Sequence, residues 1–112
     1  MRDKSDRTPA VFEAVRQSLT ELAEYARPLG ICLGLENRSH ASSFPGLDDM
    51  EALLGGFDEK VVGFWYDVGH AQTQDCLGFH SHESWLDCIG SRLVGVHLHD
   101  VIGLDDHYAP GM

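Results

Sequence analysis

Three side chains that could bind a metal ion recur at nearly constant intervals along this chain. Glu36 is followed by Asp67 after 31 positions, and Asp67 is followed by His97 after 30. One strand–helix–strand unit takes about 30 residues, and each of the three residues lies at the end of a short apolar run. Carboxylates combined with an imidazole suit divalent ions such as Mn, Zn, Fe or Co. The spacing therefore predicts one metal site built from Glu36, Asp67 and His97.

The stretch FWYDVGHAQ, residues 64–72, places further chemistry directly after its apolar part. We expect Asp67 to bind the ion and Gly69 to let the backbone turn sharply. His70 would then return toward the same cavity, as a further ligand or as a hydrogen-bond partner of a substrate. His99 shares the strand parity of His97, so it should face the same cavity and either contact substrate or support a ligand.

A purely structural interpretation is open for each of these residues alone. An acid that follows a parallel strand often caps the next helix, and a single buried histidine is usually a hydrogen-bonded core group. The recurrence of three such residues in phase favours the functional interpretation. Further along, Asp105 and His107 form an Asp-x-His pair that either holds a second ion or lies in a solvated turn. Cys76, His80, His82 and Cys88 match no common zinc-binding spacing.

Alternating helices and strands must position these groups. Thr8 and Pro9 form a typical helix start, with a hydroxyl cap and a proline in the first turn, and apolar residues then follow helical spacing. The sequence predicts helices over 9–26, 47–56 and 83–90, strands over 31–36, 61–66 and 93–99, and loops over 37–46, 71–82 and 100–112.

This order predicts an α/β fold of parallel βαβ units. Strands covered by helices are apolar on both faces, as these are. In parallel sheets, ligands bind at the carboxyl end of the strands. Neighbouring strands lie about 4.8 Å apart, so side chains from three adjacent strand ends could meet at one point.

Composition limits the partners. The chain has 112 residues, enough for one domain, and its 18 acidic and 8 basic residues give a net charge of −10. This charge argues against non-specific binding of nucleic acid through its phosphates and suits a site that binds cations.

No apolar run approaches the roughly 20 residues of a membrane span, and no signal peptide opens the chain. Three cysteines without a Cys-x-x-Cys pair predict free thiols in a cytoplasmic protein. Residues 1–8 are polar, and we expect a disordered start there.

Several short stretches, taken in order, resemble the xylose isomerase-like TIM barrel family. That family includes sugar-phosphate isomerases and epimerases, inosose dehydratase and endonuclease IV. The matching stretches are GLEN (34–37), FPG (44–46), YDVGHA (66–71), VGVHLHD (94–100) and HYAPG (107–111).

The resemblance implies a divalent metal, such as Mn, Zn, Co or Mg, at the mouth of a barrel. Glu36 matches a metal-binding glutamate that also serves as an acid or base in the epimerases. Asp67 and His97 match two further ligands. His70 matches a histidine that touches substrate in the epimerases and metal in endonuclease IV, and Asp105 with His107 resembles that enzyme's Asp-x-His pair.

The chain departs from the family in extent. A (β/α)8 barrel has eight strands and usually about 250 residues, whereas this sequence supplies three strand–helix units, resembling the fifth to seventh. The family's fourth ligand, a glutamate on the last strand, is not among them. We therefore expect a partial TIM barrel with two bare sheet edges, inactive alone and open to association, including formation of a homo-oligomer.

For the full-length protein the resemblance implies a metal-dependent isomerase or epimerase. Its substrate would be a sugar, sugar phosphate or polyol, and it would move a proton next to a carbonyl group that the metal holds. Glu36 and His70 would be catalytic, and His70 and His99 would contact substrate. Two alternatives stay open: an endonuclease that acts at abasic DNA, and an inactive metal-binding fragment.

Overall fold

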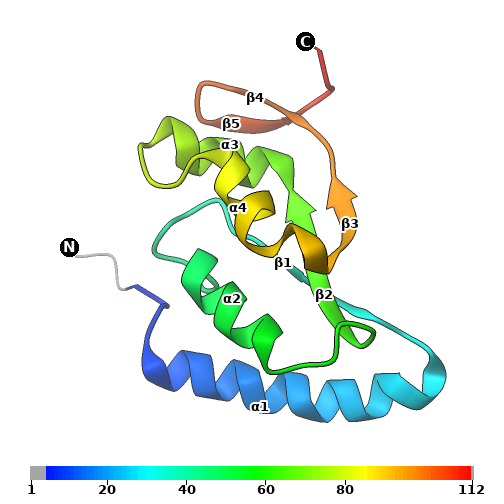
Figure 1. Ribbon diagram of the computed structural model, residues 1–112. Coiled ribbons are helices and arrows are strands. Elements are labelled where there is room, and N and C mark those ends of the chain that lie inside the picture. Colours follow the sequence, from blue (N-terminus) through cyan, green and yellow to red (C-terminus); the bar gives the residue numbers. More distant parts are fainter. Residues whose placement is uncertain (1–4, 112) are drawn as a thin grey trace.

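A computed structural model describes residues 5–111 (Figure 1). The chain begins with a long helix and then alternates strands with shorter helices. The helices are α1 (Pro9–Ala26), α2 (Leu47–Gly55), α3 (Val68–Cys76) and α4 (His82–Ile89), with short 3₁₀ turns η1 (Arg27–Leu29) and η2 (Gly90–Arg92). The strands are β1 (Leu33–Glu36), β2 (Val62–Asp67), β3 (Leu93–His97), β4 (Asp100–Ile102) and β5 (Asp105–Tyr108).

Strands β1, β2 and β3 form a parallel sheet in that order, which confirms the predicted α/β fold and the partial barrel. Glu36 pairs with Trp65, and Asp67 pairs with His97. The register between β2 and β3 shifts once, between Phe64 and Trp65. The strand ends that carry the predicted ligands therefore lie side by side at one edge of the sheet.

The hydrophobic core lies between the sheet and its helices. Figure 1 shows α2 and α4 on the same side of the sheet, with α1 running across the end where the strands begin. Strand β2 supplies the centre of this core because alternate residues along it are buried against the helices. The buried cluster consists of Ala23, Leu47, Met50, Leu54, Val61, Val62, Phe64, Tyr66, Ala71, Trp85 and Ile89.

The opposite face of the sheet is built around one indole ring. Trp65 lies between Gly34 and Gly95 on the two neighbouring strands, and a Cβ added at Gly95 would overlap its ring. The imidazole of His97 meets the same ring edge-on, with centroids 5.3 Å apart. The close approach of the Trp65 ring requires glycine at Gly95, whereas a Cβ at Gly34 would meet the ring in a tight contact of 3.2 Å.

The predictions of loops over 71–82 and 100–112 are wrong. Residues 68–76 form helix α3, which Asp67 caps at its N-terminus; the polar sequence gave no helical pattern of apolar residues. The tail contains the antiparallel hairpin β4–β5, which lies at the carboxyl edge of the sheet in Figure 1. Both elements border the predicted site, so the corrections change how that site is closed.

The sequence predicted a disordered start over residues 1–8; residues 1–4 lie outside the described residues, and residues 5–8 make contacts with the rest of the chain. The backbone N–H of Asp6 donates to the carbonyl of Ser42 at 2.8 Å. The guanidinium of Arg7 binds the carboxylates of Asp48 and Asp49, with 2.8 Å to the latter. These contacts fasten the start of the described chain to the loop before α2 and to the first turn of that helix.

Of the helices between residues 5 and 111, none combines the length and the apolar character that a bilayer crossing requires.

Candidate metal centre

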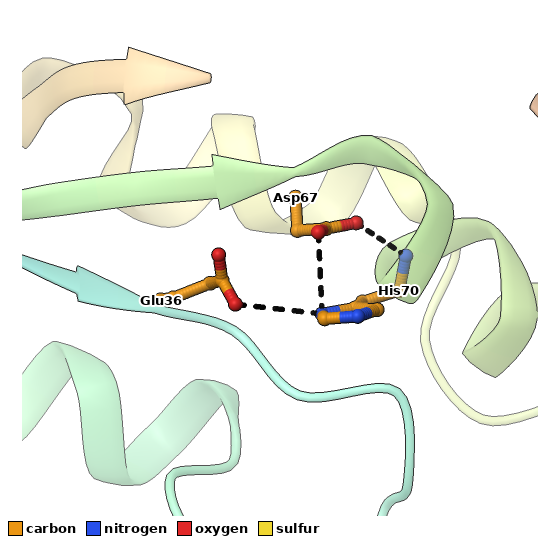
Figure 2. Close-up of side chains that lie close together, drawn as sticks. All are labelled: Glu36, Asp67 and His70. Atoms are coloured by element: carbon orange, nitrogen blue, oxygen red, sulfur yellow. Dashed lines mark hydrogen bonds and ion pairs between the residues drawn. The ribbon is translucent and has the colours of Figure 1, made fainter. Parts of the chain in front are cut away.

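The ends of β1 and β2 bring two carboxylates together. Ligand atoms of Glu36, Asp67 and His70 all lie within 4.8 Å of one another, and Figure 2 shows the three side chains pointing toward a common centre. Asp67 is almost fully buried, with a relative exposure of 2%, whereas Glu36 is partly open to solvent. Two neighbouring carboxylates repel each other, and a cation between them would relieve that repulsion.

Asp67 is both a helix cap and a candidate ligand, because its two oxygens have different partners. Oδ1 accepts the backbone N–H of His70 at 2.9 Å and lies 2.6 Å from Nε2 of His99. Oδ2 lies 3.6 Å from Nδ1 of His97. The structural interpretation and the functional one therefore apply to different atoms of the same side chain.

His97 joins the two carboxylates as the sequence spacing suggested. Its Nδ1 lies 2.6 Å from Oε2 of Glu36 and 3.6 Å from Oδ2 of Asp67. The side chain is about half exposed, at 55%, and its ring rests against Trp65. The three residues predicted as ligands thus converge, each from the end of a different parallel strand.

His70 lies near the same carboxylates but is differently engaged. Its Nδ1, 3.5 Å from Oδ2 of Asp67 and 3.9 Å from Glu36, lies only 2.8 Å from the backbone carbonyl oxygen of Asn37. A carbonyl only accepts, so Nδ1 must carry the proton and donate. A protonated nitrogen has no lone pair for a metal. Nε2 of His70 keeps its lone pair, so His97 and His70 are both candidate imidazole partners of Glu36 and Asp67.

His99 uses both of its ring nitrogens within the protein. Its Nδ1 accepts the backbone N–H of His107 at 2.9 Å, so Nε2 carries the proton that it donates to Asp67. The expected substrate contact through His99 thus finds no free ring nitrogen. The residue instead orients Asp67.

Gly69 has a different role from the sharp turn that was predicted. It lies inside α3, and a Cβ at this position would overlap the ring of His99. The absence of a side chain lets His99 approach Asp67.

The hairpin brings Asp106 to the site in place of the predicted Asp105. Asp106 Oδ2 lies 3.9 Å from Nε2 of His70, and its Oδ1 lies 2.6 Å from Nδ1 of His107. This hydrogen bond raises the pKa of His107 and lowers the pKa of Asp106. The ring of His107 stacks on that of His99, with centroids 4.4 Å apart. His107 therefore lies beside the site, whereas Asp105 is exposed and pairs with Ile102.

Two of these residues had no signal strong enough to single them out. Asn37 lies in the stretch GLEN that resembles the family, but it was given no role because an asparagine directly after a strand is also typical of a loop start. Asp106 differs from Asp105 only by strand parity, which requires knowing that residues 105–108 form a strand. His107 then breaks the parity because its φ of 67° is left-handed.

An open cavity of about 640 Å³ lies beside these groups at the carboxyl edge. Asp67, His97, His99 and His107 contribute polar lining, and Tyr108 and Pro110 of the tail contribute apolar lining. Its size suits a small molecule.

The donors present fit a divalent ion. Two carboxylates and one imidazole come from three adjacent strands, and a second imidazole, that of His99, supports the buried carboxylate. This mixed oxygen and nitrogen set suits Mn, Zn, Co or Fe better than calcium, which prefers oxygen alone.

Comparison with known proteins places these observations in a family. The chain is 31% identical over 93 residues to an uncharacterized protein, MJ1311, of Methanocaldococcus jannaschii. The match covers 81% of this chain and 31% of that protein, so the chain spans about a third of the length of the curated relative it matches. No solved structure matches. The family model described as xylose isomerase-like TIM barrel matches residues 2–112, and the chain therefore belongs to the xylose isomerase-like TIM barrel family.

Proposed function

We propose that this chain carries part of the active site of a divalent-metal-dependent isomerase or epimerase that acts on a sugar, sugar phosphate or polyol. The observation that carries the proposal is the convergence of Glu36, Asp67 and His97 beside an open cavity. The membership of the family, which includes such enzymes, supports it. A divalent ion held by these three residues would polarise a carbonyl oxygen and stabilise negative charge that develops on it.

Glu36 is the proton-transfer group in this proposal. Its Oε2 lies against His97, whereas Oε1 lies 3.9 Å from His70 and has no hydrogen-bond partner among the described residues. A carboxylate with one engaged and one free oxygen can stay fixed while it takes a proton from carbon. The partial exposure of the side chain lets a substrate reach the free oxygen.

His70 would orient the substrate. Because Nδ1 donates to the carbonyl of Asn37, the neutral ring leaves Nε2 as an acceptor. A substrate hydroxyl could donate to this nitrogen.

The charges of the described residues disfavour the nuclease alternative. Arg7 and Arg16 are paired with carboxylates, and Arg92 donates to three backbone carbonyls at 2.6 to 3.1 Å. Apart from the exposed Arg38, which follows Asn37, these pairings leave few cations among the described residues to meet phosphates at this edge.

The test uses the full-length protein loaded with Mn or Zn in heavy water. We expect deuterium to enter ketoses at the carbon next to the carbonyl, and Glu36→Gln to abolish the exchange. Glu51→Gln, at an exposed position of α2, is the matched control and should leave exchange intact. Absence of exchange across a broad sugar panel, or exchange that survives Glu36→Gln, would contradict the proposal.

A further inference from the structure

Asn37 is completely buried and joins the ends of two strands. Its side-chain Nδ2 donates to the carbonyl of Asp67 at 3.0 Å, and its Oδ1 accepts the backbone N–H of Asp67 at 2.7 Å. The last backbone pair between these strands is Glu36 with Trp65. The side-chain amide therefore continues the ladder one step further, to the residue that carries the buried carboxylate.

The backbone of Asn37 makes a second contact with the site. Its carbonyl oxygen lies 2.8 Å from Nδ1 of His70, whose side chain is largely buried. The other ring nitrogen, Nε2, lies 3.9 Å from Asp106, beyond hydrogen-bonding distance. One residue thus contacts both Asp67 and His70.

Few other side chains could pair with both the N–H and the C=O of Asp67. An amide offers one donor and one acceptor in a single plane, which matches the N–H and C=O of Asp67. Aspartate has nearly the same shape, but its second oxygen would face a carbonyl without a proton between them. Serine is too short to reach both backbone groups. A buried polar group that loses its partner is destabilising.

We propose that Asn37 is a positioning residue: its side-chain amide holds the main chain of residue 37 against that of Asp67, and thereby holds in place the backbone carbonyl that sets the tautomer of His70. The neutral His70 ring carries its proton on Nδ1 and leaves Nε2 as an acceptor on the side of Asp106, 3.9 Å away. The suggestion that a substrate hydroxyl donates to Nε2 rests on the proposed function. The tautomer and the placement of Asp67 do not.

The first measurement needs no variant. In ¹⁵N-labelled full-length protein, two-bond ¹H–¹⁵N spectra distinguish the two neutral tautomers of each histidine, at a pH where His70 is uncharged. We expect His70 to be protonated on Nδ1 and His99 on Nε2. A His70 ring protonated on Nε2, or an even mixture, would overturn the proposal whatever the variants do.

The second measurement compares Asn37→Asp and Asn37→Ser with Gln74→Glu. Gln74 is a matched control because it is also a buried amide, and its Nε2 donates to the carbonyl of Arg38 in the same loop at 2.7 Å. Both Asn37 variants keep the backbone carbonyl that accepts from His70, but its position is no longer fixed by the amide bonds to Asp67, so we expect them to lose the single His70 tautomer. They should also weaken Mn binding in calorimetry by about 10- to 100-fold, as loss of a supporting residue typically does.

The control separates positioning from general destabilisation. Gln74→Glu should lower thermal stability comparably but retain the His70 tautomer and bind Mn within about twofold of wild type. Asn37 variants that keep both properties, or a control that loses both, would overturn the proposal. Wild-type protein that shows the expected tautomer but binds no Mn would contradict the proposed function and leave the assignment of the His70 tautomer to Asn37 supported.

Discussion

Two acid–imidazole pairs lie at the same edge of the sheet, with equal distances and different surroundings. Nε2 of His99 lies 2.6 Å from Asp67, and Nδ1 of His107 lies 2.6 Å from Asp106. The first pair joins residues 32 positions apart and is nearly buried. The second joins chain neighbours on a hairpin, where the His107 side chain is 70% exposed.

The difference separates a fixed ligand from an adjustable neighbour. Asp67 is held by Asn37 just after β1, by the first turn of α3 and by His99 beyond the end of β3, so its free oxygen has one position. Asp106 is held by its own hairpin, and solvent screens its bond to His107. We infer that the buried pair prepares the site for a cation, whereas the exposed pair responds to pH.

The largest effect should follow removal of the buried charge. Asp67→Asn keeps an acceptor for the N–H of His70, since asparagine caps helices about as well as aspartate. It removes the negative charge that a cation requires. We expect Mn affinity in calorimetry to fall by more than the roughly 10- to 100-fold typical of a lost supporting residue.

The matched control is an acid–imidazole pair away from the edge. Asp75 accepts the backbone N–H of His82 at 3.0 Å and lies 2.7 Å from its Nδ1. Asp75→Asn should therefore change Mn affinity little. Equal losses in the two variants would show that Asp67 contributes only through general charge, and the distinction between the two kinds of pair would fail.

A smaller effect should come from the glycine that admits His99. In most helices Gly→Ala stabilises by up to about 1 kcal/mol. At Gly69 the new methyl group would overlap the His99 ring, and overpacking typically costs about 1–3 kcal/mol. We expect Gly69→Ala to lower the free energy of unfolding in urea and to weaken Mn binding as His99→Ala does.

Gly55 provides the comparison. It lies in α2, and nothing would contact an added Cβ within 4 Å. Gly55→Ala should be neutral or stabilising. If Gly69→Ala had the same free energy of unfolding as Gly55→Ala, the close packing of His99 against Gly69 would not be what holds Asp67. The buried pair would then be no more fixed than the hairpin pair.

The sequence predicted the parts of this site that depend on strand ends. Glu36, Asp67 and His97 are one per strand unit, and parallel topology alone brings such residues to one edge. The sheet and the helices α1, α2 and α4 were predictable for a different reason, because the spacing of their apolar residues is that of strands and helices.

What the sequence missed depends on tertiary contacts. Helix α3 has a polar sequence, and its Thr73 and Gln74 are buried by bonds to Gly69 and Arg38 that no local pattern reveals. The hairpin was hidden by the acidic run at 105–106. Asn37 and the tautomers of His70 and His99 follow from single hydrogen bonds to backbone groups, which spacing along the chain cannot specify.

The smallest expected effect concerns the pH response of the hairpin pair. The bond to Asp106 raises the pKa of His107 above its usual value of about 6.5, so the folded state holds this proton more tightly than the unfolded state. Its stabilising contribution is complete below that usual value and is lost as pH rises through the raised pKa. NMR titration of full-length protein should place the His107 midpoint above about 6.5, and Asp106→Asn should bring it down. Asp105→Asn, at the exposed neighbouring position, should move the midpoint less. An equal shift of the His107 midpoint in both variants would mean that His107 responds only to the total negative charge of the hairpin. The hydrogen bond to Asp106 would then not be the cause of the raised pKa.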